Sequence, residues 1–303
     1  MGISRRKLLK SSIALVAVAK AGPALAASTV DIADVSGTDV KAMVKAAIDA
    51  LGGIKAFVHP GDYVVLKPNA GFPNPAAWAT TTDPDIVATV AQLCLDAKAK
   101  QVVVLESPQG KVPEKCIERC GLGAALAPLT AVKVKLLTPA DFVSVTVPNG
   151  TDLKTVEIAK ALQSADVFIN IPVAKQHTNT VVSFGLKNHM GLIKDRKAFH
   201  TQLDIQTAVA DLGRVIKPHL TVLDATRELL TNGPAGPGET STPNRIIAGR
   251  NVVSVDAYGL TVAQFDGKQL KPADVKHIDL AGKAGLGLNG AALKGSVREV
   301  PEA

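Results

Sequence analysis

Histidine and lysine side chains gather in one stretch of this chain. Between residues 175 and 200 the chain carries three histidines and four lysines: His177, His189, His200, Lys175, Lys187, Lys194 and Lys197. A single histidine is usually a core or surface residue, but several titratable side chains in so short a span indicate a binding or catalytic site. Uncompensated cations repel one another, and an anion, a carboxylate partner or a metal would relieve that repulsion. The alternative is a solvated loop whose charges are screened.

From this stretch we predict catalytic and anion-binding residues. The predicted catalytic residues are His177, Lys187 and His200, since imidazole and amine groups can ligate a metal or carry a proton. Lys175 and Asn188 are predicted to bind a small anionic substrate.

Further polar residues follow the apolar runs that we expect to be strands. Lys67 and Asn69 follow one run, Glu106 follows a second and Asp224 ends a third. Ligands of parallel sheets bind at the carboxyl ends of the strands, so these residues are site candidates. The predicted anion-binding groups here are Lys67, Asn69, Thr82 and the backbone around Gly233 and Gly236. The predicted metal ligands are Glu106, Asp224 and Asp256. Helix caps, turns or a snorkelling lysine are the structural alternatives.

The elements that must position these residues alternate between strand and helix. Apolar runs predict core strands at 63–67, 102–105, 167–172 and 220–224, with further strands at 132–137, 143–147 and 155–158 in an insertion or a sheet extension. Helices are predicted near 40–51, 83–97, 202–215, 253–265 and 273–283, and a long polar loop over 175–197. The predicted fold class is α/β, a mainly parallel sheet with helices on both faces in Rossmann-like lobes. One composite domain or two interleaved lobes would fit.

The first 26 residues have the features of an export signal. Arg5 and Arg6 precede a short apolar run, and small residues near Ala26 form a cleavage site. The run is too short to span a bilayer. The pattern resembles a twin-arginine signal peptide, so we expect a chain that folds before export, is periplasmic and is not an integral membrane protein after cleavage. Its partner on this route is the twin-arginine export machinery.

Composition argues against nucleic-acid binding and against a typical iron–sulfur cluster. The leader holds five basic residues and no acidic one, so cleavage lowers the formal charge from +7 to +2, and the high pI is no sign of nucleic-acid binding. The three cysteines, Cys94, Cys116 and Cys120, are one short of the four thiolates of a typical cubane iron–sulfur cluster. Cys116 and Cys120 could pair, help to hold a metal or simply be buried.

Several segments together resemble one family. They include Leu66-Lys67-Pro68-Asn69, Thr81-Thr82-Asp83-Pro84, Glu106-Ser107-Pro108, Lys187-Asn188-His189-Met190-Gly191 and Asn232-Gly233-Pro234. In this combination the chain looks like the DUF362 family over residues 27–303, a group of uncharacterised proteins often labelled iron–sulfur binding. The order His177, Lys187, His200 is also similar to lactate racemases, and that similarity implies a nickel-pincer nucleotide held by two histidines and a lysine.

Three functions are compatible with these residues. The first is an exported enzyme that acts on a small carboxylate or phosphate with a metal or cofactor loaded before export. The second is a periplasmic binding or accessory protein that holds an anion or metal without chemistry. The third is a redox partner, against which the cysteine count argues.

Overall fold

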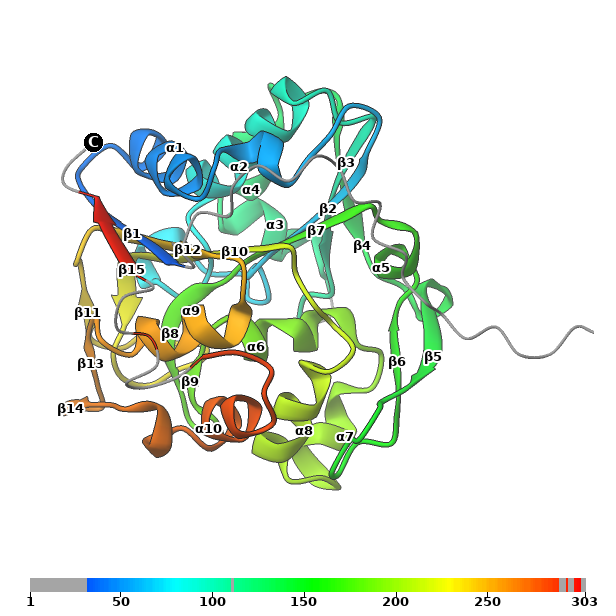
Figure 1. Cartoon of the computed structure of the whole chain (residues 1–303), viewed down its shortest axis with the longest axis vertical. Helices are drawn as coiled ribbons and strands as arrows, with labels where there is room; N and C mark the ends of the chain where they lie inside the picture. The colour runs from blue at the N-terminus through cyan, green and yellow to red at the C-terminus, as the bar shows by residue number, and fades with distance from the viewer. Residues whose placement is uncertain (1–31, 110–111, 289–292, 294–296, 301–303) are drawn as a thin grey trace, which may run out of the picture.

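A mixed sheet forms the centre of the molecule. The computed structural model describes residues 32–109, 112–288, 293 and 297–300, so the predicted leader lies outside the described residues. The main strands, in spatial order, are β15 (Val297–Val300), β1 (Ile32–Ser36), β12 (Arg245–Gly249), β10 (Leu220–Leu229), β7 (Val167–Ile171), β2 (Tyr63–Pro68), β3 (Gln101–Glu106) and β4 (Val132–Leu136) (Figure 1). From β10 to β4 the neighbours are parallel, whereas β12 is antiparallel to β10 and β1. The predicted mainly parallel α/β fold is confirmed.

Helices cover both faces of this sheet. One face packs against α1 (Val40–Ala50), α2 (Pro84–Asp96), α3 (Glu114–Arg119) and α4 (Leu122–Leu126) (Figure 1). The other carries α5 (Ala161–Ser164), α6 (Gly185–Asn188), α7 (Arg196–Thr201), α8 (Ile205–Leu212), α9 (Val252–Gly259) and α10 (Lys276–Lys283). Side chains alternate along β2, where Val64 and Leu66 belong to the first core and Val65 to the second. This alternation turns Lys67, two residues after Val65, toward the α6 side.

Short elements complete the described chain. The additional strands are β5 (Phe142–Thr146), β6 (Thr155–Ala159), β8 (Val173–His177), β9 (Val181–Ser183), β11 (Thr240–Ser241), β13 (Gln264–Phe265) and β14 (Lys268–Gln269). The 3₁₀ turns are η1 (Ile54–Ala56), η2 (Ala76–Trp78), η3 (Pro139–Asp141), η4 (His189–Leu192) and η5 (Pro272–Asp274). Among the described helices, none has the length and apolarity needed to cross a membrane.

The loop predicted over 175–197 is wrong. β8 pairs with β10 and with β9, and α6, η4 and the start of α7 follow. Most of this segment is buried, including Lys175, His177 and Lys187. Several of its polar side chains contact one another or line a cleft, so composition alone suggested a loop.

One other boundary needs correction, and the strands expected in an insertion or a sheet extension divide between the two. The helix predicted over 253–265 ends at Gly259 and a β-hairpin follows, whose turn has Asp266 and Gly267 at positive φ. The strand predicted over 132–137 extends the main sheet as β4, whereas β5 and β6 form a separate antiparallel pair. By contrast, α2 begins where predicted, because Asp83 accepts the Asp85 N–H at 2.9 Å and Pro84 occupies the first turn.

Candidate functional site

A cleft of about 310 Å³ lies at the carboxyl ends of β2, β3 and β8, facing α6 and α7. The structure brings eight of the predicted residues to it: Lys67, Asn69, Glu106, Lys175, His177, Lys187, Asn188 and His200. The strands carry Lys67, Glu106, Lys175 and His177, Asn69 directly follows β2, and the two helices carry the last three. The volume suits a small ligand.

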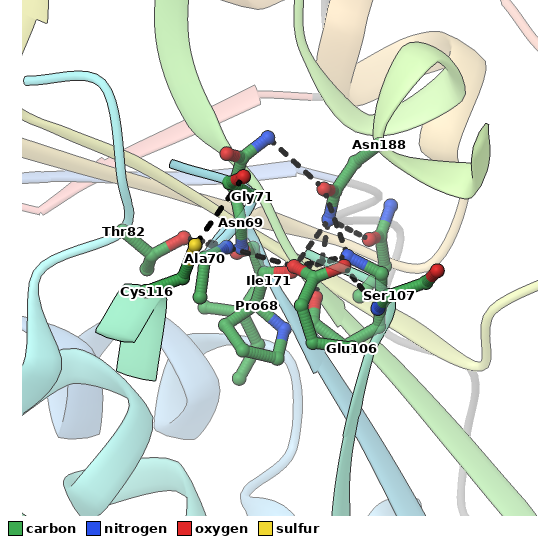
Figure 2. Close-up of polar contacts among 12 residues, drawn as sticks. Pro68, Asn69, Ala70, Gly71, Thr82, Glu106, Ser107, Cys116, Ile171 and Asn188 are labelled. Atoms are coloured by element: carbon green, nitrogen blue, oxygen red, sulfur yellow. Dashed lines mark hydrogen bonds and ion pairs between the residues drawn. The ribbon is translucent and has the colours of Figure 1, made fainter. Parts of the chain in front are cut away.

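A closed ion pair forms the floor of the cleft. Lys67 Nζ lies 2.9 Å from Glu106 Oε2, and both side chains are almost fully buried. Glu106 also accepts the backbone N–H groups of Ala70 at 2.8 Å and Ser107 at 2.9 Å (Figure 2). Burial lowers the pKa of Lys67, and the Glu106 carboxylate opposes that shift. Gly191 permits the close approach of η4, because a Cβ there would lie 2.5 Å from Lys67 Cε.

Two asparagines link this pair to the next lysine. Asn188 Oδ1 accepts from Asn69 Nδ2 at 3.2 Å (Figure 2) and from Lys67 Nζ at 3.3 Å. Asn188 Nδ2 donates to Asn170 Oδ1 at 2.8 Å. Asn69 Oδ1 in turn accepts from Lys175 Nζ at 3.1 Å. The amides of Asn69 and Asn188 are therefore committed to orienting the two lysines.

Lys175 is a buried cation without a carboxylate partner among the described residues. Besides Asn69, its Nζ donates to the Thr80 carbonyl, and it lies 5.0 Å from the centre of the Phe72 ring. Burial, followed by the positive charge of Lys187, lowers the pKa of Lys175 to about 7. Its charge is therefore sensitive to what occupies the cleft.

Lys187 is the least satisfied cation in the cleft. The residue is 8% exposed, and no described residue forms a hydrogen bond or ion pair with its Nζ. Burial, and then the charge of Arg196, lower its pKa to about 8. The helix that carries it, α6, is held in place by Asp256, whose carboxylate accepts the backbone N–H groups of Gly185 at 2.7 Å and Leu186 at 2.8 Å.

His177 and His200 stack beside Lys187, with ring centroids 6.4 Å apart and planes inclined by 11°. His177 is buried, and burial followed by the charges of Lys187 and Lys175 lowers its pKa to about 2. Its Nδ1 accepts the Asn179 N–H at 3.0 Å, so the neutral ring carries its hydrogen on Nε2. His200 is more exposed, and burial also lowers its pKa.

Sequence reasoning missed Arg196, which lines the same cleft and donates from Nη1 to the Ser107 carbonyl at 2.6 Å. It lies within the segment already chosen, so its charge and position were the available signal. The lining therefore combines three lysines and Arg196 with a single carboxylate, Glu106, among the described residues. Such an excess of positive charge attracts anions.

Five predicted site residues do not line the cleft. Thr82 Oγ1 donates to the Ile171 carbonyl at 2.7 Å and accepts the Asn69 N–H at 2.8 Å, so it fixes the strand ends. Asp224 accepts the Asp83 N–H at 2.7 Å, and Asp256 caps α6. Gly233 packs on Gln176, and Gly236 takes a positive φ beside Thr80. All five support the fold around the cleft; burial raises the pKa of Asp224 to about 6 and that of Asp256 to about 7.

The described residues do not form a metal centre. No group of three or more His, Cys, Asp and Glu side chains is placed to hold an ion in the described part of the chain. His177 presents a hydrogen rather than a lone pair on Nε2. The three cysteines are free and buried, and burial raises the pKa of Cys94 to about 12 and that of Cys116 to about 11. Protonated, buried thiols do not fit an iron–sulfur cluster.

Comparison with known proteins assigns the family. The model of the family described as a domain of unknown function, DUF362, matches residues 64–261, which include every predicted site residue. The chain belongs to the DUF362 family. A thylakoid-associated protein of Synechocystis sp. is 30% identical over 262 residues, covering 82% of this chain and 75% of that protein.

Two solved structures are distant matches to this DUF362 protein. The lactate racemase apoprotein of Thermoanaerobacterium thermosaccharolyticum has a TM-score of 0.41 and 14% identity, covering 63% of this chain. A Thermotoga maritima protein has a TM-score of 0.37 and 14% identity, covering 61% of this chain. The DUF362 chain matches 49% of the length of each of these two structures.

Proposed function

We propose that the cleft binds a small anion, a carboxylate or a phosphate, and that the protein is an enzyme that moves a proton on it. The observation that carries this proposal is the state of Lys187, a residue only 8% exposed that lines the cleft and whose Nζ has no hydrogen-bond or carboxylate partner among the described residues. A buried, unpaired cation is costly, and a bound anion would supply the missing charge and hydrogen-bond acceptors.

Acid–base chemistry is supported by the groups beside that ammonium. The pKa of Lys187 is lowered to about 8 and that of Lys175 to about 7, so both amines exchange protons near neutral pH. His177 is neutral and offers an N–H, which can donate to an oxygen of the ligand. In this proposal Lys187 is the proton carrier, His177 orients the ligand and His200 closes the solvent side.

The residues of the cleft fit neither cofactor that the family resemblances imply. A nickel-pincer nucleotide would require ring lone pairs, and His177 does not present one at Nε2. An iron–sulfur cluster would require thiolates in the lining of the cleft, and none of the three cysteines lines it. No step is therefore assigned to either group.

The N-terminal sequence supports a periplasmic place of action. The pair Arg5 and Arg6 before an apolar run is typical of a twin-arginine signal peptide. The relative named as thylakoid-associated is compatible with an exported or membrane-associated location. We infer that the chain folds in the cytoplasm, is exported by this route and acts in the periplasm.

Binding can be tested by calorimetry with inorganic phosphate and, separately, acetate at low ionic strength. At pH 7 we expect Lys187→Met to weaken binding of the preferred anion at least about tenfold, because one charge-assisted contact is lost. Lys217→Met is the matched control, since Lys217 is exposed and does not line the cleft. Equal binding by the wild type and Lys187→Met would contradict an anion site at Lys187.

Catalysis can be separated from binding with the natural ligand. Protein recovered from its own periplasm is denatured, the released anion is identified by mass spectrometry, and that anion is returned to fresh protein in deuterium oxide. Incorporation of deuterium into the ligand, lost in Lys187→Met, supports proton transfer. Binding without incorporation would favour the accessory or binding protein.

A further inference from the structure

Arg196 is the first residue of α7 and brings a guanidinium group to the wall of the cleft. His200 follows four residues later and lines the same cleft, so one face of this helix is turned toward it. Arg196 Nη1 donates to the Ser107 carbonyl at 2.6 Å, and this is the only hydrogen bond of the guanidinium with the described residues. The carbonyl therefore fixes one corner of the group and leaves the edge between Nε and Nη2 unbonded.

This edge and the Lys187 ammonium are both open to a ligand. Elsewhere in the described chain, Arg227 Nε lacks a partner and is shut off from solvent, but Lys187 Nζ and the Arg196 nitrogens are not shut off in this way. Both residues line a cleft of about 310 Å³, the size of one small molecule, so one ligand can contact both. Their proximity is also visible in the pKa of Lys187, which the charge of Arg196 lowers.

The charges of the cleft do not balance. Its lining has four cationic side chains and one carboxylate, Glu106, which is bonded to Lys67 at 2.9 Å. The net charge is therefore +3 when Lys175 is protonated and +2 when it is not, since burial keeps His177 and His200 neutral near pH 7. A monoanion would leave at least one of these cations uncompensated, whereas a dianion brings the cleft close to neutrality.

The unused hydrogen-bond donors lie toward one end of the cleft. Lys175 Nζ already donates to Asn69 Oδ1 and to the Thr80 carbonyl, which occupy two of its three hydrogens. Lys187, on α6, has all three hydrogens free of described partners, and Arg196, on α7, has its free edge. One group with two charges and several oxygens would satisfy these donors, whereas a dicarboxylate would need a second set of free donors at Lys175.

We propose that the ligand carries a phosphoryl group, and that the free edge of Arg196 and the ammonium of Lys187 hold this group together. This phosphoryl site rests on the proposed function, because it is the anion site of the same cleft. A phosphate monoester has nearly two negative charges at neutral pH and three terminal oxygens. Two of these oxygens match the planar edge of a guanidinium, and the third can accept from an ammonium.

Calorimetry at about pH 7.5 and low ionic strength tests the site with four small probes: methyl phosphate, dimethyl phosphate, malonate and acetate. Methyl phosphate is mostly a dianion at this pH, dimethyl phosphate is a monoanion with the same phosphorus centre, and malonate divides its two charges between carboxylates. We expect methyl phosphate to bind at least about tenfold more tightly than each of the others.

Variants of arginine locate the contact. Arg196→Met should weaken methyl phosphate binding at least about tenfold, because the charge-assisted pair of hydrogen bonds is lost. Arg119→Met, at an exposed arginine of α3 that does not line the cleft, should leave the affinity unchanged. If Arg196→Met does not fold, Arg196→Lys replaces it, and we expect weaker binding there too, since the charge remains but the planar edge is lost.

The contrary outcomes are distinct. Binding of malonate or acetate as tight as that of methyl phosphate would keep the anion site of the proposed function but overturn the phosphoryl group. Equal binding of methyl and dimethyl phosphate would overturn the requirement for a second charge. Wild-type affinity for methyl phosphate in a folded Arg196 variant would remove Arg196 from the site. If none of the four probes binds, the proposed anion site fails and the phosphoryl site fails with it.

Discussion

Replacing Glu106 by glutamine tests how the floor of the cleft is held together. The carboxylate compensates the buried Lys67 ammonium at 2.9 Å and accepts two backbone N–H groups, from Ala70 and Ser107. In Glu106→Gln one carboxylate oxygen is replaced by an NH₂ group, which faces hydrogen-bond donors and cannot accept from them. The variant also leaves the Lys67 charge buried without a counter-ion.

The expected cost follows from burial. Removing one partner of a buried ion pair typically costs about 3–5 kcal/mol, out of about 5–15 kcal/mol for the whole free energy of unfolding. The chain offers a matched surface pair, Lys194 and Glu157, 2.8 Å apart with side chains 41% and 43% exposed. Breaking such an exposed pair costs about 0–1 kcal/mol, so Glu157→Gln is the control.

Urea unfolding of the mature chain measures the difference. With a slope of about 3 kcal/mol per molar urea, Glu106→Gln should lower the midpoint by about 1 to 1.7 M, and Glu157→Gln by about 0.3 M or less. Adding Lys67→Met to Glu106→Gln should restore part of the loss, because the uncompensated charge disappears. Equal midpoints for Glu106→Gln and Glu157→Gln would refute the description of a buried, charged pair.

Three further predictions address the cleft, α6 and the leader. Without an anion, the free energy of unfolding should rise between about pH 7 and 8.5. The pKa values of Lys175 and Lys187 are lowered to about 7 and 8, so the unfolded chain binds more protons than the folded chain in this range. Above this range the buried thiols, whose pKa is raised, oppose the rise. Urea midpoints across this range check it, and a falling midpoint would contradict it. Asp256→Asn should cost about 1–3 kcal/mol in urea unfolding and weaken phosphate binding, because α6 loses backbone caps, whereas the more exposed Asp279→Asn should do neither. Joint replacement of Arg5 and Arg6 by lysine should block export in cell fractionation, and normal arrival in the periplasm would remove the twin-arginine assignment.

The core strands could be predicted from the sequence because their side chains have an apolar environment. Runs of Val, Leu and Ile such as those in β2 and β7 are buried on both faces, so apolarity alone identifies them. The start of α2 could also be predicted from neighbouring residues, since the capping residue and the proline that begin this helix are adjacent in sequence. The end of the helix at Gly259 could not be predicted from neighbouring residues, because the hairpin that follows packs Phe265 against Phe184, far away in the chain.

Part of the candidate site could be predicted from the sequence for a related reason. Lys67, Glu106 and the segment from Lys175 to His200 follow strand ends or cluster in sequence, and such signals are visible without a structure. Asp224 and Asp256 gave the same signal, yet their carboxylates accept backbone N–H groups below the cleft. Residue type and position cannot distinguish a carboxylate that faces a ligand from one that faces the backbone.

The sequence by itself determined which segments become strands of the sheet and which residues at the strand ends line the cleft. Both follow from residues that are neighbours in sequence, because burial and chain direction depend on short runs of residues. Only the tertiary structure decided which cations are paired. Lys67 has Glu106 from the next strand, Lys175 has amide and carbonyl oxygens, and Lys187 has no partner among the described residues. Pairing and protonation depend on distances between segments far apart in the chain, and those distances arise only when the helices pack on the sheet.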